Sequence, residues 1–187
     1  LGQDIHGATL GILGMGRIGL EMAKRAHGFG MTILYHDVVR RPLDEEKKYG
    51  IIYQPLDTVL RKSDFISVHV NLIPETYHLI GKRELTLMKP TAVLINAARG
   101  PVIDPKALYH ALKNKVINAA GLDVTDPEPI PFDDPLISLD NCIIVPHIAS
   151  ASVATRLRMS TMAADNLING LKGKRMVNCV NPEVYQS

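Results

Sequence analysis

The sequence has few of the residues that would place it outside the ordinary class of globular proteins. It has no Trp, only two Cys and an aromatic fraction of 5%, and its apolar runs, such as Cys142–Val145, are short. Two cysteines are too few for a disulfide framework, and no run approaches the roughly 20 apolar residues that span a bilayer. The first residues lack a basic segment followed by an apolar one, so no signal peptide is visible. We therefore expect a reduced, cytoplasmic protein that does not span a membrane.

A large excess of charge of one sign is also absent. The 21 Lys and Arg against 19 Asp and Glu give a formal net charge of +2. Such a balance argues against nucleic acid or an anionic membrane surface as the main partner. The hydrophobic fraction of 46% over 187 residues suits one well-buried core. We predict a single domain over residues 1–187.

Apolar, β-branched runs alternate with helical patterns along the chain. The predicted strands are Ala8–Leu13, Met31–Tyr35, Phe65–Val70, Ala92–Asn96, Val116–Leu122 and Cys142–Val145. The predicted helices are Arg17–Phe29, Asp57–Arg61, Lys82–Met88, Pro105–Asn114 (capped by Asp104) and Ser152–Leu171. The strands are continuously apolar, which is expected when helices cover both faces of a sheet. The order predicts an α/β fold in three layers, with a doubly wound parallel sheet and right-handed crossovers.

A glycine-rich turn follows the first predicted strand. Gly14, Gly16 and Gly19 have the spacing G-x-G-x-x-G and lead into a predicted helix. The first glycine permits a tight turn, the second lets the backbone approach a pyrophosphate, and the third lets the helix pack closely on the strand. Arg17 and Ile18 begin the helix, whose N-terminal N–H groups attract phosphate. With a strand before it and a helix after it, the motif predicts a Rossmann-type dinucleotide site.

The residues after the second predicted strand bear on the choice of cofactor. Asp37 lies 18 residues after Gly19 (37 − 19 = 18), where an acidic side chain meets the ribose hydroxyls of the adenosine. A carboxylate there repels the 2′-phosphate of NADP and so favours NAD. Arg40 and Arg41 follow closely, either as a receptor for that phosphate or as part of a solvated charge cluster. The sequence predicts NAD, with NADP as the alternative.

Three more segments follow predicted strands, at the edge where open parallel sheets bind ligands. Together with the glycine turn they resemble the NAD-binding domain of the D-isomer-specific 2-hydroxyacid dehydrogenases, from Leu10 to Val184. The resemblance rests on the glycine motif followed by Ala98-Arg99-Gly100, Asp123, Glu128-Pro129 and Pro146-His147. Singly, these residues have structural explanations: Arg99 as a loop cap, Glu128 as a surface acid, His147 as a structural histidine. In combination and in this order, they favour the catalytic interpretation.

The resemblance implies that Arg99, Glu128 and His147 form a catalytic set. His147 would give a proton to the carbonyl oxygen of a 2-oxo acid while the cofactor gives a hydride to its C2, and Glu128 would orient the ring. Arg99 offers a planar fork to a carboxylate or a carbonyl oxygen. The cofactor contacts implied are Gly14, Gly16, Arg17, Ile18, Gly19, Asp37, Val70, Asn71, Thr76, Ala97, Ala98, Arg99, Asp123, His147, Ala149 and Ser150. A proline is common in the family at Asn71, which leaves that contact open.

No metal site is predicted. The acids between Asp123 and Asp134 are interrupted by prolines at a spacing that does not fit a calcium loop. The remaining histidines lack the spacing of metal ligands, and only His36 and His69 are expected near the cofactor cleft.

The resemblance also bears on the substrate and on what lies outside the chain. Gly121–Pro135 and Val180–Val184 look most like the glyoxylate and hydroxypyruvate reductase branch, which acts on small 2-oxo and 2-hydroxy acids. Glu128 argues against the formate dehydrogenase branch, which has a glutamine there, and phosphoglycerate dehydrogenase stays open. Members of the family have a separate substrate domain and form homodimers, so we interpret these residues as one domain of a larger protein. The non-enzymatic alternative is an NAD-sensing corepressor, a branch that keeps the same three residues.

Overall fold

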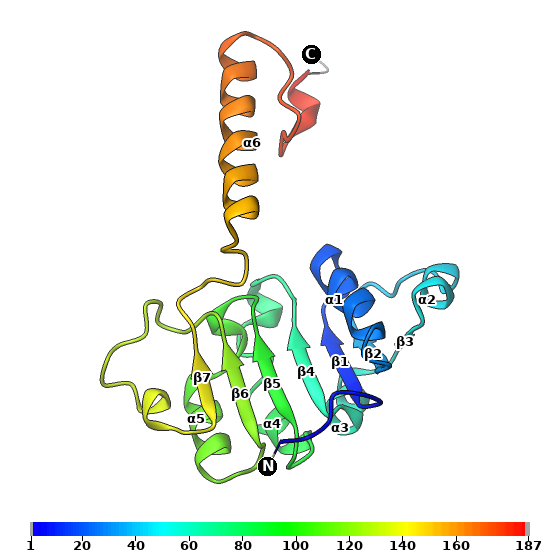
Figure 1. The fold of residues 1–187 in the computed structure, drawn as a ribbon, viewed down its shortest axis with the longest axis vertical. Helices are drawn as coiled ribbons and strands as arrows, with labels where there is room; N and C mark the ends of the chain where they lie inside the picture. The colour runs from blue at the N-terminus through cyan, green and yellow to red at the C-terminus, as the bar shows by residue number, and fades with distance from the viewer. Residues whose placement is uncertain (1, 186–187) are drawn as a thin grey trace. The chain divides into compact units, whose positions relative to one another are not determined.

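The computed structural model describes residues 2–185, which form two compact units that divide between His147 and Ile148. In the described residues, the first unit contains a seven-stranded, all-parallel sheet in the order β3-β2-β1-β4-β5-β6-β7 (Figure 1). The strands are β1 (Thr9–Leu13), β2 (Thr32–His36), β3 (Ile51–Tyr53), β4 (Phe65–Val68), β5 (Val93–Asn96), β6 (Ala119–Leu122) and β7 (Cys142–Ile144). The helices of this unit are α1 (Arg17–His27), α2 (Leu43–Tyr49), α3 (Leu56–Lys62), α4 (Lys82–Leu87) and α5 (Pro105–Lys113).

The predicted parallel α/β sheet is confirmed, and two elements were missed. All six predicted strands and all five predicted helices are present, with ends that differ by at most three residues. The segment of α2, Leu-Asp-Glu-Glu-Lys-Lys-Tyr, has too few apolar residues to show a helical stripe. Strand β3 is three residues long and lies at the edge of the sheet, so neither length nor periodicity identifies it.

Two clusters of buried side chains hold the sheet between its helices. Ala23 and Ala26 of α1 pack with residues of β1 and β2 such as Ile12 and Ile33. A larger cluster joins α3, α4 and α5 to the other face across β4, β5 and β6. Asp104 caps α5 as predicted, because its side chain accepts hydrogen bonds from the amides of Lys106 and Ala107.

In the first unit, the two faces of the sheet are not equally covered at β5, β6 and β7. In β5 and β6, buried residues alternate with half-buried ones, and Ile143 in β7 is 70% exposed. A Cβ added to Gly121 would meet nothing within 4 Å. Within the first unit, one face of β5–β7 is thus less covered than the other. A continuously apolar sequence does not show how fully each face of a strand is covered.

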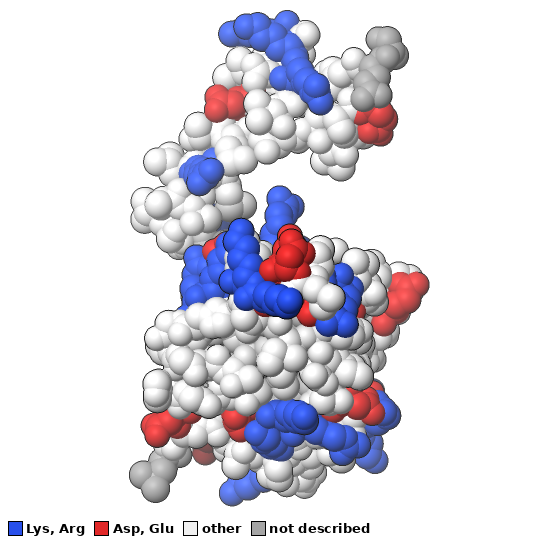
Figure 2. Space-filling model, turned by 90° about the vertical axis from the view of Figure 1, so that its right-hand side faces the viewer, with Lys and Arg blue, Asp and Glu red and all other residues white. Residues whose placement is uncertain are grey.

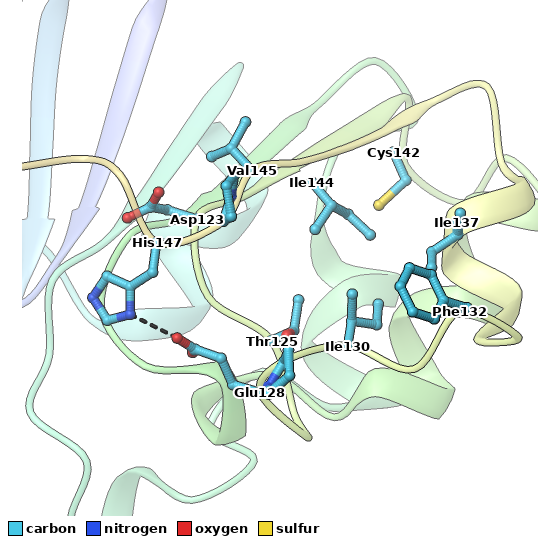
Figure 3. Close-up of a pocket in the computed structure, with 12 residues that line it drawn as sticks. Asp123, Thr125, Glu128, Ile130, Phe132, Ile137, Cys142, Ile144, Val145 and His147 are labelled. Carbon is cyan, nitrogen blue, oxygen red and sulfur yellow. Dashed lines mark hydrogen bonds and ion pairs between the residues drawn. The ribbon is translucent and has the colours of Figure 1, made fainter. Parts of the chain in front are cut away.

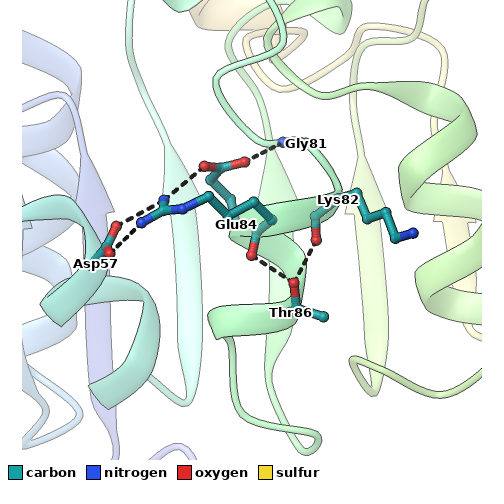
Figure 4. A network of polar contacts seen from close by, with 6 residues as sticks. Asp57, Gly81, Lys82, Glu84 and Thr86 are labelled. Atoms are coloured by element: carbon teal, nitrogen blue, oxygen red, sulfur yellow. Dashed lines mark hydrogen bonds and ion pairs between the residues drawn. The ribbon is translucent and has the colours of Figure 1, made fainter.

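An ion-pair network on the surface ties α3 to α4 (Figure 4). The Arg83 guanidinium contacts Asp57 of α3 and Glu84 of its own helix, with N–O distances of 2.5 and 3.0 Å. Glu84 also accepts a hydrogen bond from the Gly81 amide, at the start of α4. The bond from Arg83 lowers the pKa of Asp57. Exposed pairs contribute about 0–1 kcal/mol each, so this network adds little to the stability of the fold.

The second unit contains α6 (Val153–Leu171) and a short 3-10 helix, Pro182–Tyr185. Ser152 caps α6, since its side-chain oxygen accepts from the Thr155 amide at 3.2 Å. Several apolar residues of this helix are exposed, among them Leu157, Leu167 and Leu171. Among the helices that the structure describes, no segment has the length and apolar character needed to cross a membrane. On the face drawn in Figure 2, basic and acidic side chains lie next to one another, in keeping with the balanced net charge.

Candidate functional site

The carboxyl ends of the parallel strands bring distant parts of the sequence to one edge of the first unit. A cavity of about 430 Å³ is lined by the start of α1, the segment after β4 and the segment after β5. A second cavity of about 240 Å³ lies against the glycine turn and the end of β2. The residues they share are His69, Val70 and Asn71, so the two cavities adjoin along this segment. The predicted cofactor residues that line one or both are Gly14, Gly16, Ile18, Asp37, Val70, Asn71, Thr76, Ala97, Ala98 and Arg99.

The three glycines of the turn have three different surroundings. Gly14 has φ +91°, and a Cβ there would lie 2.7 Å from the carbonyl atoms of His69. A Cβ on Gly19 would overlap the carbonyl oxygen of Gly14, so this glycine lets α1 begin directly against the turn. A Cβ on Gly16 would meet nothing within 4 Å. The turn is thus closed on the side of the protein and open at Gly16, where a pyrophosphate can approach the backbone.

Asp37 contacts the glycine turn from the end of β2. Its Oδ2 accepts a hydrogen bond of 2.6 Å from the Met15 amide, and its Oδ1 accepts one of 3.1 Å from the Val39 amide. The carboxylate also lines the smaller cavity. Asp37 therefore both holds the glycine turn and contributes to the cavity where the sequence predicts a ribose.

His69 lies between the two cavities. Its Nε2 is 2.8 Å from the Ser67 hydroxyl, and its backbone amide donates to the Leu13 carbonyl. Burial lowers the pKa of His69, so the ring is neutral at pH 7. The expectation that His36 and His69 line the cleft agrees with the structure, in which both line the smaller cavity.

The predicted proton donor is paired with the predicted glutamate (Figure 3). His147 Nδ1 lies 2.7 Å from Glu128 Oε1. The His147 backbone, at φ 53°, donates to the carbonyl of Asp123, the residue after β6. A carboxylate can only accept, so Nδ1 carries the hydrogen of this bond and Nε2 is left to face a reacting group. This is the geometry of an oriented acid–base histidine.

A cavity of about 730 Å³ adjoins the pair, with Asp123, Glu128 and His147 at one end. The other end is apolar and includes Phe132 and Cys142 (Figure 3). Burial raises the pKa of the Cys142 thiol to about 11, which leaves it protonated at neutral pH. Cys142 is half-buried.

Arg99 lies in a loop that Asn96 and Gly100 hold in place. Neither of these two residues was assigned a role from the sequence. The Arg99 side chain is exposed and donates to the Ala98 carbonyl at 2.6 Å. Asn96 is 1% exposed, and its carboxamide accepts from the Ala98 amide and donates to the Arg99 carbonyl. A Cβ on Gly100 would overlap the Thr125 carbonyl, so the Arg99 loop lies directly on the segment that leads to Glu128. A buried asparagine that ends an apolar strand was the available signal.

Several predicted residues have other surroundings. Arg17 begins α1 with an exposed side chain and lines neither of the two adjoining cavities. The Thr76 hydroxyl donates to the Asn71 carbonyl, so Thr76 holds the loop as well as lining the cavity. Ala149 and Ser150 belong to the second unit. Among residues 2–185, no three His, Cys, Asp or Glu side chains are grouped as metal ligands would be.

Comparisons with known proteins agree with this architecture. Residues 1–149 match the family model described as D-isomer specific 2-hydroxyacid dehydrogenase, NAD binding domain. A glyoxylate reductase of Korarchaeum cryptofilum is 56% identical over 186 residues, which are 100% of this chain and 56% of that protein. A glyoxylate/hydroxypyruvate reductase B of Enterobacter agglomerans is 52% identical over 99% of this chain and 57% of that protein. A crystal structure of D-lactate dehydrogenase with NAD+ from Lactobacillus jensenii gives a TM-score of 0.87 at 34% identity, over 95% of this chain and 56% of the other.

Proposed function

Because the chain belongs to the D-isomer specific 2-hydroxyacid dehydrogenase family, we propose that it binds NAD(H) and supplies the catalytic groups of an oxidoreductase for a small 2-oxo or 2-D-hydroxy acid. Glyoxylate and hydroxypyruvate, which are in the names of the relatives described above, are the proposed substrates. The observation that carries the proposal is the His147–Glu128 pair, which lies at the same edge of the sheet as the open glycine turn. The relatives' names give the corepressor alternative no support.

The residues at the edge of the sheet fit a dinucleotide. The open backbone at Gly16 and the N-terminus of α1 would hold the pyrophosphate, with Ile18, which is 67% exposed, beside it. Asp37 would bind the ribose hydroxyls and repel a 2′-phosphate, which supports NAD over NADP. When bound, the nicotinamide supplies the hydride or receives it. Of the remaining predicted contacts, Asp123, Ala149 and Ser150 are proposed for the nicotinamide end.

The proposed catalytic residues would transfer one proton to or from the substrate and bind its negatively charged oxygens. His147 Nε2 would give a proton to the carbonyl oxygen during reduction and take it back during oxidation. Glu128 fixes the direction of the ring through the bond at Nδ1. Arg99, with its exposed fork, would bind the substrate carboxylate or the carbonyl oxygen, where a guanidinium stabilises developing negative charge.

The chain spans a little over half the length of the two curated relatives. We propose that a substrate domain, in the part that these relatives have and this sequence lacks, closes over the cofactor and excludes water. The 187 residues alone would then bind NADH but turn over 2-oxo acids negligibly, since Arg99 and His147 are exposed. A cytoplasmic homodimer is the proposed form of the complete protein.

The test is turnover of glyoxylate and hydroxypyruvate with NADH by the complete protein in which this chain occurs. His147→Asn should lower kcat by roughly 10²–10⁴-fold, the range expected for loss of a general acid. Glu128→Gln should lower it less, because the amide can still orient the ring. The matched control is His110→Asn, an exposed histidine near the end of α5. Normal turnover by the His147 variant would remove this residue from the mechanism, and no turnover of any 2-oxo acid by the unaltered protein would contradict the proposed reaction.

A further inference from the structure

Two arginines follow β2 at the place where a receptor for the 2′-phosphate of NADP would lie, and both have other partners. Arg40 donates two hydrogen bonds of 2.8 Å to the carboxylate of Glu46, a buried residue of α2. Arg41 forms an ion pair of 2.9 Å with Glu45, in the same helix. Among the described residues, neither arginine lines either of the two adjoining cavities. Because both arginines are paired with carboxylates of α2 and lie outside the two cavities, they are not placed to bind a 2′-phosphate.

Arg41 contacts the glycine turn itself. Its Nε and Nη2 donate hydrogen bonds of 2.9 and 2.8 Å to the carbonyl oxygen of Met15, the residue between Gly14 and Gly16. The amide of Met15 is held by Asp37, as described above. The residue between the two glycines is thus held at its carbonyl by a cation and at its amide by an anion. Bonds to charged groups are stronger than neutral ones, so the two together restrict the turn.

Tyr35 fixes the direction from which Arg41 approaches. Its side chain is fully buried, and its hydroxyl accepts from the Arg41 amide at 2.9 Å and donates to Glu46 at 2.7 Å. Glu46 in turn holds Arg40. Burial raises the pKa of Tyr35 to about 12, so the hydroxyl keeps its proton at neutral pH. The missed helix α2 therefore supplies both carboxylates of a network that ends on the turn.

We propose that Arg41 is a positioning residue for the dinucleotide: it holds the Met15 carbonyl so that the backbone at Gly16 is ordered before the cofactor arrives. The inference rests on the proposed function. A turn ordered in advance binds more tightly, because less conformational freedom is lost on binding. Arg41 then contributes to affinity for NADH and NADPH alike, since the pyrophosphate common to both lies on the turn. A phosphate receptor would contribute to NADPH alone.

The test uses the 187-residue chain and direct titration calorimetry with NADH and NADPH. Arg41→Met keeps the length of the side chain and removes its donors, and we expect it to weaken NADH by about tenfold, with NADPH weakened equally where it binds measurably. Arg41→Lys, with a point charge in place of a fork, should give an intermediate loss. The control is Arg25→Met, an exposed arginine of α1 whose partner is Glu21. Thermal unfolding of each variant checks that the fold is retained.

A second measurement distinguishes positioning from direct contact. Hydrogen exchange of the Met15 amide, without nucleotide, should be faster by about tenfold in the Arg41→Met chain and by less in the Arg41→Lys chain, because the Met15 carbonyl loses the guanidinium that holds it. Loss of NADPH affinity alone would show that Arg41 is a phosphate receptor and would overturn the proposal. Unchanged NADH affinity or unchanged exchange would also overturn it. Failure of the unaltered chain to bind NADH would instead count against the proposed function.

Discussion

Gly100 offers the sharpest test of how the catalytic segments are spaced. A Cβ at this position would overlap the carbonyl of Thr125 and lie 2.8 Å from the Asp126 amide nitrogen, where ordinary contact begins at 3.4 Å. Gly100→Ala therefore requires the two segments to separate by at least 0.6 Å at Asp126 (3.4 − 2.8 = 0.6) and by more at Thr125. The obstacle is backbone on both sides, so no side chain can turn away. Overpacking of this kind costs about 1–3 kcal/mol.

The assay is urea unfolding of the 187-residue chain, with Gly121→Ala as the matched control. Gly121 lies in the neighbouring strand β6, where an added Cβ meets nothing within 4 Å. The control should be neutral or stabilising by up to about 1 kcal/mol, because alanine restricts the unfolded chain. If the complete protein has the proposed activity, Gly100→Ala should also lower its kcat, because the displaced segment leads to Glu128. Equal free energies of unfolding for the two variants would refute the reasoning.

Two further predictions follow from the pKa shifts. Burial lowers the pKa of His69, so this residue contributes stability that is full above its unfolded pKa of about 6.5 and is lost as pH falls below it. His69→Gln should thus reduce the loss of unfolding free energy between pH 7.5 and 5.5, and an unchanged loss would contradict the assignment. Because the pKa of Cys142 is raised to about 11, only about 0.1% is thiolate at pH 8. Iodoacetamide should alkylate it far more slowly in the native chain than in urea, and equal rates by mass spectrometry would show the thiol to be accessible.

Much of the fold could be predicted because parallel strands with helical crossovers leave a regular pattern. The runs that became β1, β4 and β5 are apolar enough to be read without a structure, and the strand–turn–helix context identifies the glycine turn. The spacing of Gly14, Gly16 and Gly19 is local, so the role of each glycine follows from the backbone alone. The pairing of Glu128 with His147 was expected from the family resemblance, and the distance of 2.7 Å was available only from the structure.

The missed features depend on contacts between distant residues. Asn96 and Gly100 matter because of what lies against them, and the sequence does not show which residues those are. Arg40 and Arg41 were weighed as phosphate ligands because the helix that engages them, α2, was itself not predicted.

The proposed function depends on the binding of NAD(H) across the open glycine turn. The measurement that tests it most directly is calorimetric titration of NADH into the unaltered chain and into Gly16→Asn. Asparagine is at least as good as glycine at the N-cap position that Gly16 occupies, so the fold should be as stable as before. Its side chain enters the space beside Gly16, where an added Cβ meets nothing within 4 Å. We expect saturable binding by the unaltered chain and a loss of at least about tenfold in the variant, at an unchanged unfolding temperature. Equal binding by both chains, or none by the unaltered chain, would contradict it.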